Sequence, residues 1–435
     1  MKKNITKYLL LALACLGLQS CLFQEENYFD DSSANRATAD VSRCGELLKG
    51  APNGWVMEYY VGKDYSLGGI TLLCRFDGQR VTMASQMAEA DETVSSLYSV
   101  KSEQATMLSF DTYNYLVHYF GQPQGSMSDD PNGTLGGDYE FIISSASADC
   151  VELKGKKYGN RIVMKALSED QTWKQYLTKI KKVEDDAFFY EYDLLMDGLY
   201  TGQMLRSNYT FIVTYYDEIG KVHQKTVPFM FTADGMRFHE PVTIDGQTMQ
   251  NFVWKNELIS FVCTDEGATG IKLAGVYTAG YQSYDYYPGT YQMDFYRLND
   301  ETQQLEVASQ EVRLLKNEDG KSYWLKGLEY DILVMFDKPR GGLSVSPQLL
   351  KKVQGGYVYL AMWDVMNDYV LRSESIGLIS YATTNGIYLV DNGVWMGEVS
   401  GFIFGVYNSQ EEDAAFIGYT DAVASIRLVK KTIEE

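Results

Sequence analysis

Short runs of apolar residues, separated by turn-forming pairs, dominate most of the chain. Pairs such as Asp77-Gly78 and Gly159-Asn160 stand at the joints between runs, and such pairs favour tight hairpin turns. The pattern therefore predicts short strands that follow one another in antiparallel order. In the first part of the chain the predicted strands are 55–60, 70–76, 80–85, 93–101, 106–113, 115–120, 138–145, 150–155 and 161–167.

Two further blocks of strand-like runs follow, one over about 199–278 and one that begins near Gly289. Within the last block, residues 347–353 are expected to add a short helical turn. No repeat at a fixed period is visible, which argues against a solenoid or a propeller. We therefore expect a mainly β fold with a few short helices, built from tandem antiparallel barrel or sandwich modules that are lipocalin-like.

Two segments have the spacing of helices instead. In residues 33–50 four apolar residues recur three or four positions apart: Ala37, Val41, Cys44 and Leu48. This helix is expected to pack on the first sheet. A second helix is predicted over about 169–184, because Ser168 followed by Gln171 has the form of a capping box. Residues 187–199 fit a helix or a strand equally well.

The N-terminus has the features of a bacterial lipoprotein. Three lysines precede the apolar run 8–18, which is too short to span a bilayer and fits a secretory signal peptide. The run ends before Ser20-Cys21, a sequence that resembles a lipobox, so Cys21 is the predicted lipid-modified first residue of the mature protein. An ordinary signal peptide or a membrane anchor is the alternative. The acidic residues that follow resemble a surface-export signal of Bacteroidota lipoproteins, and an acidic tether is the other reading.

These patterns together predict five segments along the chain. They are a signal peptide (1–20), a lipidated tether (21–32), a helix with a β module (33–190), a second β module (191–278) and a C-terminal β module (279–435).

The charge of the chain excludes one class of partner. Of its 435 residues, 38 are Lys or Arg and 58 are Asp or Glu, so the formal net charge is −20. Removal of residues 1–20 takes away three lysines and no acid, which makes it −23. Proteins that bind nucleic acid need cations to displace counterions from phosphates, so we expect no nucleic-acid partner. The 34 tyrosines agree with a β-rich fold.

Little in the sequence indicates catalysis or a metal site. The three histidines, His118, His223 and His239, are far apart, and His118 is expected to be an ordinary strand residue. No catalytic or metal-binding motif is present, so we predict no catalytic residue, no metal and no cofactor. Carboxylates are abundant, however, and a pair of Asp or Glu residues that hydrolyses glycosides stays open as an alternative.

Four cysteines follow the lipidation site: Cys44, Cys74, Cys150 and Cys263. Their spacing shows no CxxC pair and no metal pattern. We expect them to be buried as small apolar side chains, although one disulfide is possible in an oxidising compartment.

The densest aromatic segment, residues 281–296, is the best local candidate for ligand binding. Tyr291, Met293 and Phe295 alternate along a predicted strand and are expected in the core. Tyrosines at a loop can stack on sugars or peptides and orient them through the hydroxyl group. The candidate binding residues are therefore Tyr281, Tyr284, Tyr286 and Tyr287, with Trp363 and Trp395 as weaker candidates.

Several segments resemble an uncharacterised family of Bacteroidota lipoproteins, numbered 4302 among domains of unknown function. The resemblance rests on NYFDDSSANRATADV (27–41), NGWVMEYY (53–60), LSFDTYNYLVHYF (108–120), GGDYEFII (136–143) and LKGKKYGNRIVM (153–164). It implies an accessory surface lipoprotein beside a SusC/SusD-like uptake system, and it supplies no catalytic residues.

We therefore expect a non-catalytic, lipid-anchored protein of the outer membrane, exposed at the cell surface. It would help to capture an oligopeptide or a glycan beside a SusC/SusD-like, TonB-dependent transporter. The alternatives are a hydrolase with an Asp/Glu pair and a purely structural scaffold of the transporter complex.

Overall fold

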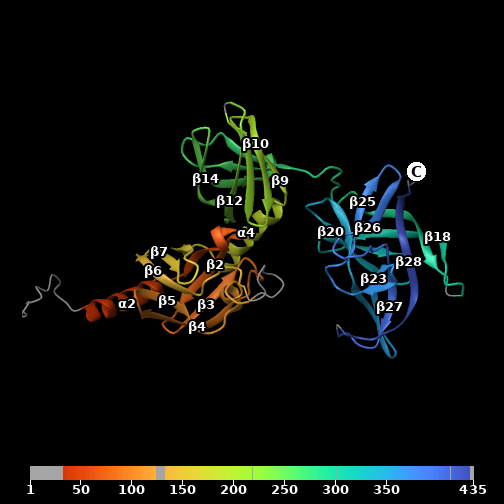
Figure 1. Ribbon diagram of the computed structural model, residues 1–435, viewed down its shortest axis with the longest axis horizontal. Helices are drawn as coiled ribbons and strands as arrows, with labels where there is room; N and C mark the ends of the chain where they lie inside the picture. Colours follow the sequence, from red (N-terminus) through yellow and green to blue (C-terminus); the bar gives the residue numbers. More distant parts are fainter. Residues whose placement is uncertain (1–32, 124–132, 218, 300, 412, 432–435) are drawn as a thin grey trace, which may run out of the picture. The chain divides into compact units, whose positions relative to one another are not determined.

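The computed structural model describes residues 33–431 except 124–132, 218, 300 and 412. The predicted signal peptide, the tether and the lipidation site Cys21 lie outside these residues. The predicted fold class is confirmed, because the chain forms three antiparallel, barrel-like sheets in tandem along the sequence (Figure 1). In the described part of the chain, no helix has the length and apolar character needed to cross a membrane.

The first sheet is a closed barrel of eight strands. They are β1 (Trp55–Val61), β2 (Gly68–Phe76), β3 (Arg80–Ser85), β4 (Val94–Ser102), β5 (Thr106–Phe110), β6 (Glu140–Ala146), β7 (Cys150–Gly155) and β8 (Arg161–Ala166). Closure follows from β1, which pairs with β2 on one side and with β8 on the other. Trp55, Met57 and Tyr59 alternate along β1 and belong to the buried core of this barrel, as period-2 side-chain alternation requires.

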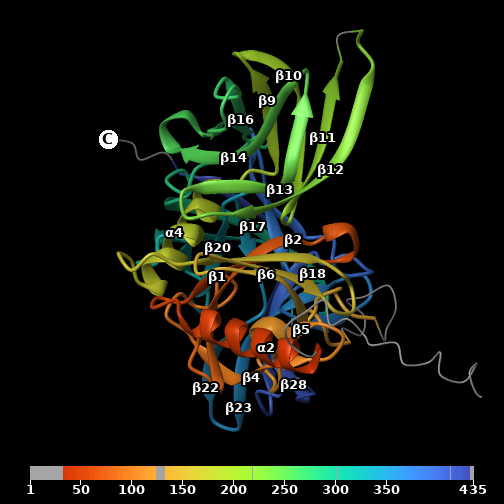
Figure 2. The same ribbon diagram turned by 90° about the vertical axis from the view of Figure 1, so that its left-hand side faces the viewer.

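The second sheet is also a closed barrel of eight strands. They are β9 (Glu191–Met196), β10 (Leu199–Ser207), β11 (Thr210–Tyr216), β12 (Val222–Phe231), β13 (Gly235–Ile244), β14 (Gln247–Lys255), β15 (Ser260–Cys263) and β16 (Ile271–Val276). Residues 191–196, whose pattern fitted a helix or a strand, are therefore a strand. Figure 2 shows β11 and β12 as a long hairpin, and their paired residues extend from Thr210 with Pro228 to Tyr216 with Val222.

The third sheet has twelve strands. They are β17 (Gly289–Leu298), β18 (Leu305–Lys316), β19 (Ser322–Lys326), β20 (Ile332–Asp337), β21 (Gly342–Val345), β22 (Gln348–Val353), β23 (Gly356–Asp364), β24 (Tyr369–Leu371), β25 (Leu378–Thr383), β26 (Gly386–Asp391), β27 (Gly401–Tyr407) and β28 (Phe416–Lys430). Pairing of β17 with β28 closes eight of them into a ring, and β27, β23, β22 and β24 continue the sheet beyond β28.

Among the described residues the helices are α2 (Ser33–Lys49), α3 (Tyr115–His118) and α4 (Trp173–Asp186), with 3-10 turns η1 (Lys63–Tyr65) and η3 (Asn256–Leu258). The predicted helix 33–50 is confirmed as α2, which packs on β4 and β5 of the first sheet (Figure 2). Its buried face includes Cys44 and Leu48, and the Leu48 carbonyl accepts a hydrogen bond from Trp55 Nε1 at 2.8 Å.

The N-cap of α4 lies four residues later than the sequence predicts. Thr172 is the capping residue, because its Oγ1 accepts from the Gln175 amide while Gln175 Oε1 accepts from the Thr172 amide. Ser168 instead uses its backbone carbonyl, which accepts from Asn53 Nδ2 at 2.7 Å. The chain 168–171 is thus held against residue 53 and cannot start the helix.

Two predicted elements were wrong. Residues 115–118 form α3 and not a strand, because the Asn114 side chain caps the segment and Leu116, Val117 and Phe120 are buried at helical spacing. Residues 348–353 form the strand β22 and not a helical turn. Tertiary pairing with β23 overrides the local helix preference of this segment.

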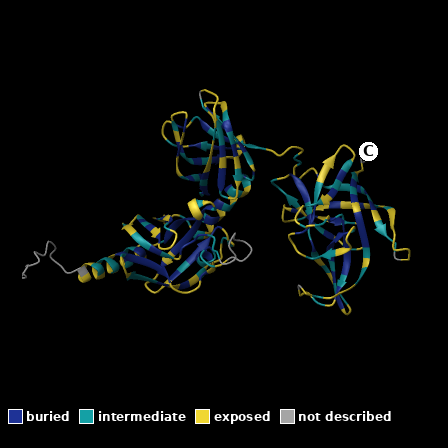
Figure 3. Cartoon of the chain, in the orientation of Figure 1, coloured by how far each residue is buried: buried dark blue, intermediate teal, exposed yellow. Residues whose placement is uncertain are grey.

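By compactness the chain divides into two units. The N-terminal unit comprises residues up to 185 with 207–255 and 261–271, and the C-terminal unit comprises 186–206, 256–260 and 272–435. Figure 3 shows buried residues inside the sheets and exposed residues concentrated at the turns. In the C-terminal unit the main core lies inside the third sheet and includes Tyr291, Met293 and Phe295, as their alternation predicts.

Candidate functional site

The candidate site lies on one face of the extension formed by β23, β27 and β28. Along β23, Val358, Leu360 and Met362 belong to the main core of the third sheet. The intervening residues Tyr359 and Trp363 therefore lie on the opposite face, since successive side chains of a strand alternate. Trp363 forms a separate small cluster there with residues of β27 and β28.

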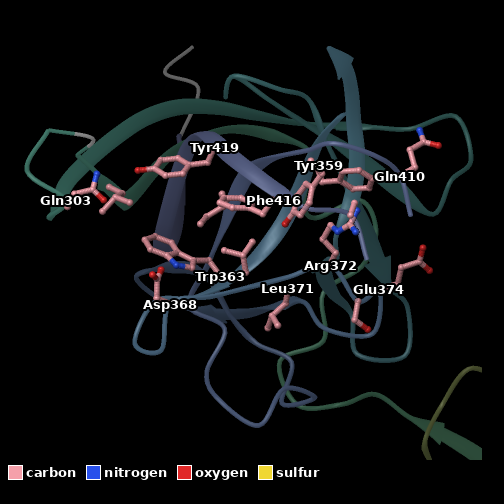
Figure 4. Close-up of a pocket in the computed structure, with 16 residues that line it drawn as sticks. Gln303, Tyr359, Trp363, Asp368, Leu371, Arg372, Glu374, Gln410, Phe416 and Tyr419 are labelled. Atoms are coloured by element: carbon pink, nitrogen blue, oxygen red, sulfur yellow. The ribbon is translucent and has the colours of Figure 1, made fainter. Parts of the chain in front are cut away.

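This opposite face is hollowed into a cavity of about 1050 Å³ (Figure 4). That volume is at the upper end of the range of small-molecule sites, which is about 300–1,000 Å³. Most of the lining side chains come from β23, β24, β27 and β28 and from the segments beside these strands. The lining residues are Leu298, Gln303, Tyr359, Trp363, Asp368, Val370, Leu371, Arg372, Ser373, Glu374, Ile403, Tyr407, Gln410, Ala414, Phe416 and Tyr419.

Aromatic side chains from three strands line the cavity. The rings of Tyr359 and Tyr407 meet edge to face at 5.7 Å, and those of Tyr407 and Phe416 at 5.4 Å. Gly405 lies beside them, and a Cβ there would come within 2.9 Å of the Tyr407 ring and 3.0 Å of the Phe416 ring. Glycine at 405 therefore lets both rings lie close to the strand.

Trp363 has a polar atom to which no described residue forms a hydrogen bond. The residue is 4% exposed, and its Nε1 is buried with no hydrogen-bond partner among the described residues. A buried donor without an acceptor is costly in a folded protein. Its position in the lining of a cavity makes Trp363 a candidate contact for a ligand that brings an acceptor.

Arg372 is the cation of the cavity, and its surroundings hold it firmly. Its guanidinium lies 5.0 Å from the centre of the Tyr359 ring and 4.3 Å from that of Tyr407, which are cation–π contacts. Nη2 donates to the backbone carbonyl of Glu411 at 2.6 Å. Burial raises the pKa of Tyr407, and the charge of Arg372 opposes that rise, so Tyr407 stays a neutral phenol.

The polar side chains lie at the ends of the cavity. Asp368 is in the turn before β24, with φ of 57°, and Glu374 follows that strand. Figure 4 shows Asp368 at one end of the cavity and Glu374 at the other, with Leu371 between them. The turn is braced by Asp364, whose pKa is lowered chiefly by a hydrogen bond from the Asn367 side chain.

Two known protein families match parts of this chain. Residues 25–256, slightly more than half of the chain, match the model described as "Domain of unknown function (DUF4302)". The chain belongs to this family. A second domain of unknown function, DUF4987, matches residues 264–404, which include Tyr359, Trp363 and Arg372. Neither description assigns an activity.

Comparisons of this DUF4302 protein with curated proteins and with solved structures give no further indication of its function. No curated protein matches it. A crystal structure of a protein of unknown function from the DUF3598 family of Nostoc punctiforme PCC 73102 is 8% identical, with a TM-score of 0.14, over 56% of this chain and 98% of that one. Intact Ap-TbpB (N and C lobes) is 10% identical, with a TM-score of 0.14, over 87% of this chain and 76% of that one. Both TM-scores are too low to support an inference.

The tyrosines predicted as a binding site lie elsewhere in the DUF4302 chain, and none of them lines the cavity described above. Tyr287 is buried and donates its hydroxyl to the Gly341 carbonyl at 2.8 Å, while Tyr284 packs on the main core. Tyr286 is exposed, and the Tyr281 ring stacks on Phe188 at 6.0 Å. Ligand binding by these four side chains stays a prediction.

Of the five aromatic residues that line the cavity, the sequence indicates only Trp363, as a weaker binding candidate. Tyr359, Tyr407, Phe416 and Tyr419 are ordinary strand residues by pattern. Their signal is weak, because an outward aromatic residue in alternation with a core residue is common in sheets. Only the pairing of β23 with β27, and of β27 with β28, brings them together.

The histidines and cysteines do not assemble into a site. His118 ends α3, where its ring stacks on Tyr139, and His223 pairs with Asp217 at 2.9 Å. No group of three or more His, Cys, Asp or Glu in the described residues could hold a metal ion.

The four cysteines are free thiols; Cys44, Cys74 and Cys263 are buried and Cys150 is half-buried. Burial raises the pKa of Cys263 to about 11, which keeps it a thiol.

A smaller cavity of about 320 Å³ lies in the N-terminal unit, and two of its lining residues are carboxylates. Glu58 is buried and pairs with Lys165 at 3.0 Å and with Arg237. Glu152 pairs with Arg161 at 2.6 Å. Each carboxylate already binds a cation, which is the arrangement of structural ion pairs that join strands.

Proposed function

We propose that this protein is a lipid-anchored accessory protein of the outer-membrane surface that captures a nutrient ligand in the aromatic cavity of its C-terminal unit. The observation that supports binding is the cavity itself, of about 1050 Å³ and lined by five aromatic residues. Ligand sites are concave and mostly apolar, with a few convergent polar groups. This cavity meets that description.

Binding is favoured over catalysis by the placement of the cavity's carboxylates. Glycoside hydrolases need two carboxyl groups about 5–9.5 Å apart across the scissile bond. Asp368 and Glu374 instead flank β24 at opposite ends of the cavity (Figure 4). Arg372 is held by two rings and a carbonyl, so its role is to shape the wall of the cavity.

The anchor and the location rest on the N-terminal sequence. A short apolar run followed by Ser20-Cys21 supports lipidation of Cys21, and a mature charge of −23 suits a protein held in solvent at a cell surface. A lipid at Cys21 with an acidic tether after it would leave both compact units outside the membrane.

The partner is inferred from the family. The resemblance of this chain to Bacteroidota lipoproteins supports a position beside a SusC/SusD-like, TonB-dependent transporter. In this arrangement the cavity would hold an oligopeptide or a glycan close to the transporter until it is taken up.

Two measurements test the proposal. A C-terminal affinity tag should recover the transporter from detergent-solubilised outer membranes, and its clean absence would contradict the accessory role. The Cys21→Ser variant should move from the membrane fraction to the soluble fraction and lose incorporation of labelled palmitate. A variant that stays lipidated at the membrane would contradict the predicted anchor.

A further inference from the structure

The cavity lies mainly on the face of a sheet. The strand β23 pairs with β27 on one side and with β22 and β24 on the other, and β28 pairs with β27 and β17. Peptides that bind sheets usually add a strand to an open edge through main-chain hydrogen bonds. Of the strands beneath this cavity, β23, β27 and β28 are paired on both sides, and β24 pairs with β23 alone. With three residues (Tyr369–Leu371), β24 gives an added strand only a short edge, so we expect recognition mainly by side chains.

The side chains on offer suit a ring with both an apolar face and hydroxyl groups. The aromatic rings of the cavity can stack on the C–H faces of sugars, and their polar neighbours can bond the hydroxyls. Trp363 adds a donor-only indole N–H that has no partner among the described residues. A sugar hydroxyl is an acceptor that would satisfy it.

The charges of the cavity disfavour an anionic ligand. Among the described residues, its lining has one cation, Arg372, and two carboxylates, Asp368 and Glu374. The guanidinium is engaged by two rings and by the Glu411 carbonyl, and the whole chain has a formal charge of −20. A polyanion would therefore be repelled both at long range and inside the cavity.

The cavity is longer than one sugar ring. Tyr359 and Trp363 are four residues apart on β23, which is about 13 Å of strand. Figure 4 shows Gln303, Tyr419, Trp363 and Asp368 toward one end of the cavity and Tyr359, Arg372, Gln410 and Glu374 toward the other. Each end thus combines aromatic faces with an amide and a carboxylate.

We infer that the ligand is a neutral oligosaccharide that spans both ends of the cavity with at least two sugar rings. This inference rests on the proposed function, which places the captured nutrient in this cavity. It narrows the ligand from peptide or glycan to uncharged glycan. It assigns stacking to Tyr419 at one end and Tyr359 at the other, with Phe416 between them (Figure 4).

Isothermal titration of the purified mature chain tests the inference. The probes are maltohexaose, cellohexaose, xylohexaose and mannohexaose, with hexagalacturonate and a chymotryptic digest of casein for comparison. At least one neutral hexasaccharide should bind, and binding should shift the tryptophan emission. Tyr419→Ala and Phe416→Ala should each weaken binding about 10-fold or more, as loss of an aromatic contact in a pocket does.

Tyr381→Ala is the matched control. Tyr381 is 64% exposed on β25 of the same sheet and does not line the cavity, so the affinity should not change. Far-UV circular dichroism of each variant verifies that the fold is intact. Since Trp363 is buried, the two more accessible aromatic residues are the primary variants.

The following results would contradict the inference or one of its arguments. Casein peptides that bind in a Phe416-dependent way, without any neutral sugar, overturn the inference and leave the proposed function standing. Tighter binding of hexagalacturonate than of the neutral sugars overturns the charge argument. Sugar binding that is unchanged in both variants places the site elsewhere. If none of the probes binds, both the inference and capture in this cavity are wrong.

Discussion

Two buried tryptophans, Trp55 and Trp363, differ in whether the indole N–H has a hydrogen-bond partner. Trp55 is completely buried in the first barrel, and its Nε1 donates to the Leu48 carbonyl, which fastens α2 to β1. Trp363 is nearly as buried, yet its Nε1 has no partner among the described residues. A satisfied indole stabilises a core, whereas an unsatisfied one costs stability and is better explained by a ligand.

Replacement of Trp55 by Phe should therefore destabilise the protein. The change removes the hydrogen bond to Leu48, leaves a buried carbonyl unpaired and reduces core volume, so we expect a loss of about 2–4 kcal/mol in the free energy of unfolding. Urea titration followed by circular dichroism measures it. Trp324→Phe, at a residue 36% exposed, is the control and should change stability by less than about 0.5 kcal/mol.

His239 should make the N-terminal unit sensitive to acid. Its ring lies 4.3 Å from the Tyr60 ring and 3.9 Å from the Tyr65 ring, and burial is the main cause that lowers its pKa from 6.5. Arg237 and Arg161 lower this pKa further, whereas Glu240 and Glu58 raise it. The unfolded chain therefore binds a proton more readily than the folded one.

Stability should accordingly fall as the pH falls from about 6.5 through the lowered pKa of the folded state. The measurement is the urea midpoint between pH 7.5 and 5. His239→Gln cannot titrate and should show a shallower loss over the same range. Identical pH profiles for the two proteins would show that this histidine does not contribute.

At the scale of elements, tertiary contacts choose where helices begin. The segment before α4 has two candidate caps, Ser168 and Thr172, and both have a glutamine three residues later. Asn53 binds the carbonyls of Ser168 and Gln171 and accepts from Trp173 Nε1. The path of the turn 168–171 is therefore set by the first barrel, and the helix starts only after Thr172.

The two caps can be compared directly. Thr172→Ala removes the side-chain acceptor for the Gln175 amide and should cost about 1 kcal/mol in unfolding free energy. Ser168→Ala keeps the backbone carbonyl that Asn53 uses and should be nearly neutral. Equal losses in urea titrations of the two variants would contradict the observed cap.

At the scale of the whole molecule, each sheet closes on itself, so that strands that would otherwise lie at an open edge pair with each other. The first two sheets close completely, and in the third the pairing of β17 with β28 closes a ring of eight strands around one core. The remaining four strands extend from β28, and the open face of this extension bears the cavity. One face of the extension packs into the main core, which leaves the opposite face for binding.

A fragment of residues 279–435, which contains all twelve strands of the third sheet, should therefore fold alone. Circular dichroism and tryptophan fluorescence should report one coincident, cooperative unfolding transition. Binding of a hydrophobic dye, together with loss of near-UV signal, would indicate a molten state and contradict this expectation. The boundary at 278/279 is a prediction from sequence pattern that this experiment examines.

The sequence by itself determined the fold class, most strands and α2, because alternation, helical spacing and turn pairs act over a few neighbouring residues. Local pattern failed at 348–353 and at Ser168, where contacts from distant segments decided the conformation. At 115–118 the decisive contact is local, because the side chain of Asn114 caps the helix. The local sequence pattern also did not predict the cavity. Tyr359, Tyr407 and Tyr419 meet only because β23, β27 and β28 pair in one register, and such pairing between separated strands depends on the closed sheet as a whole.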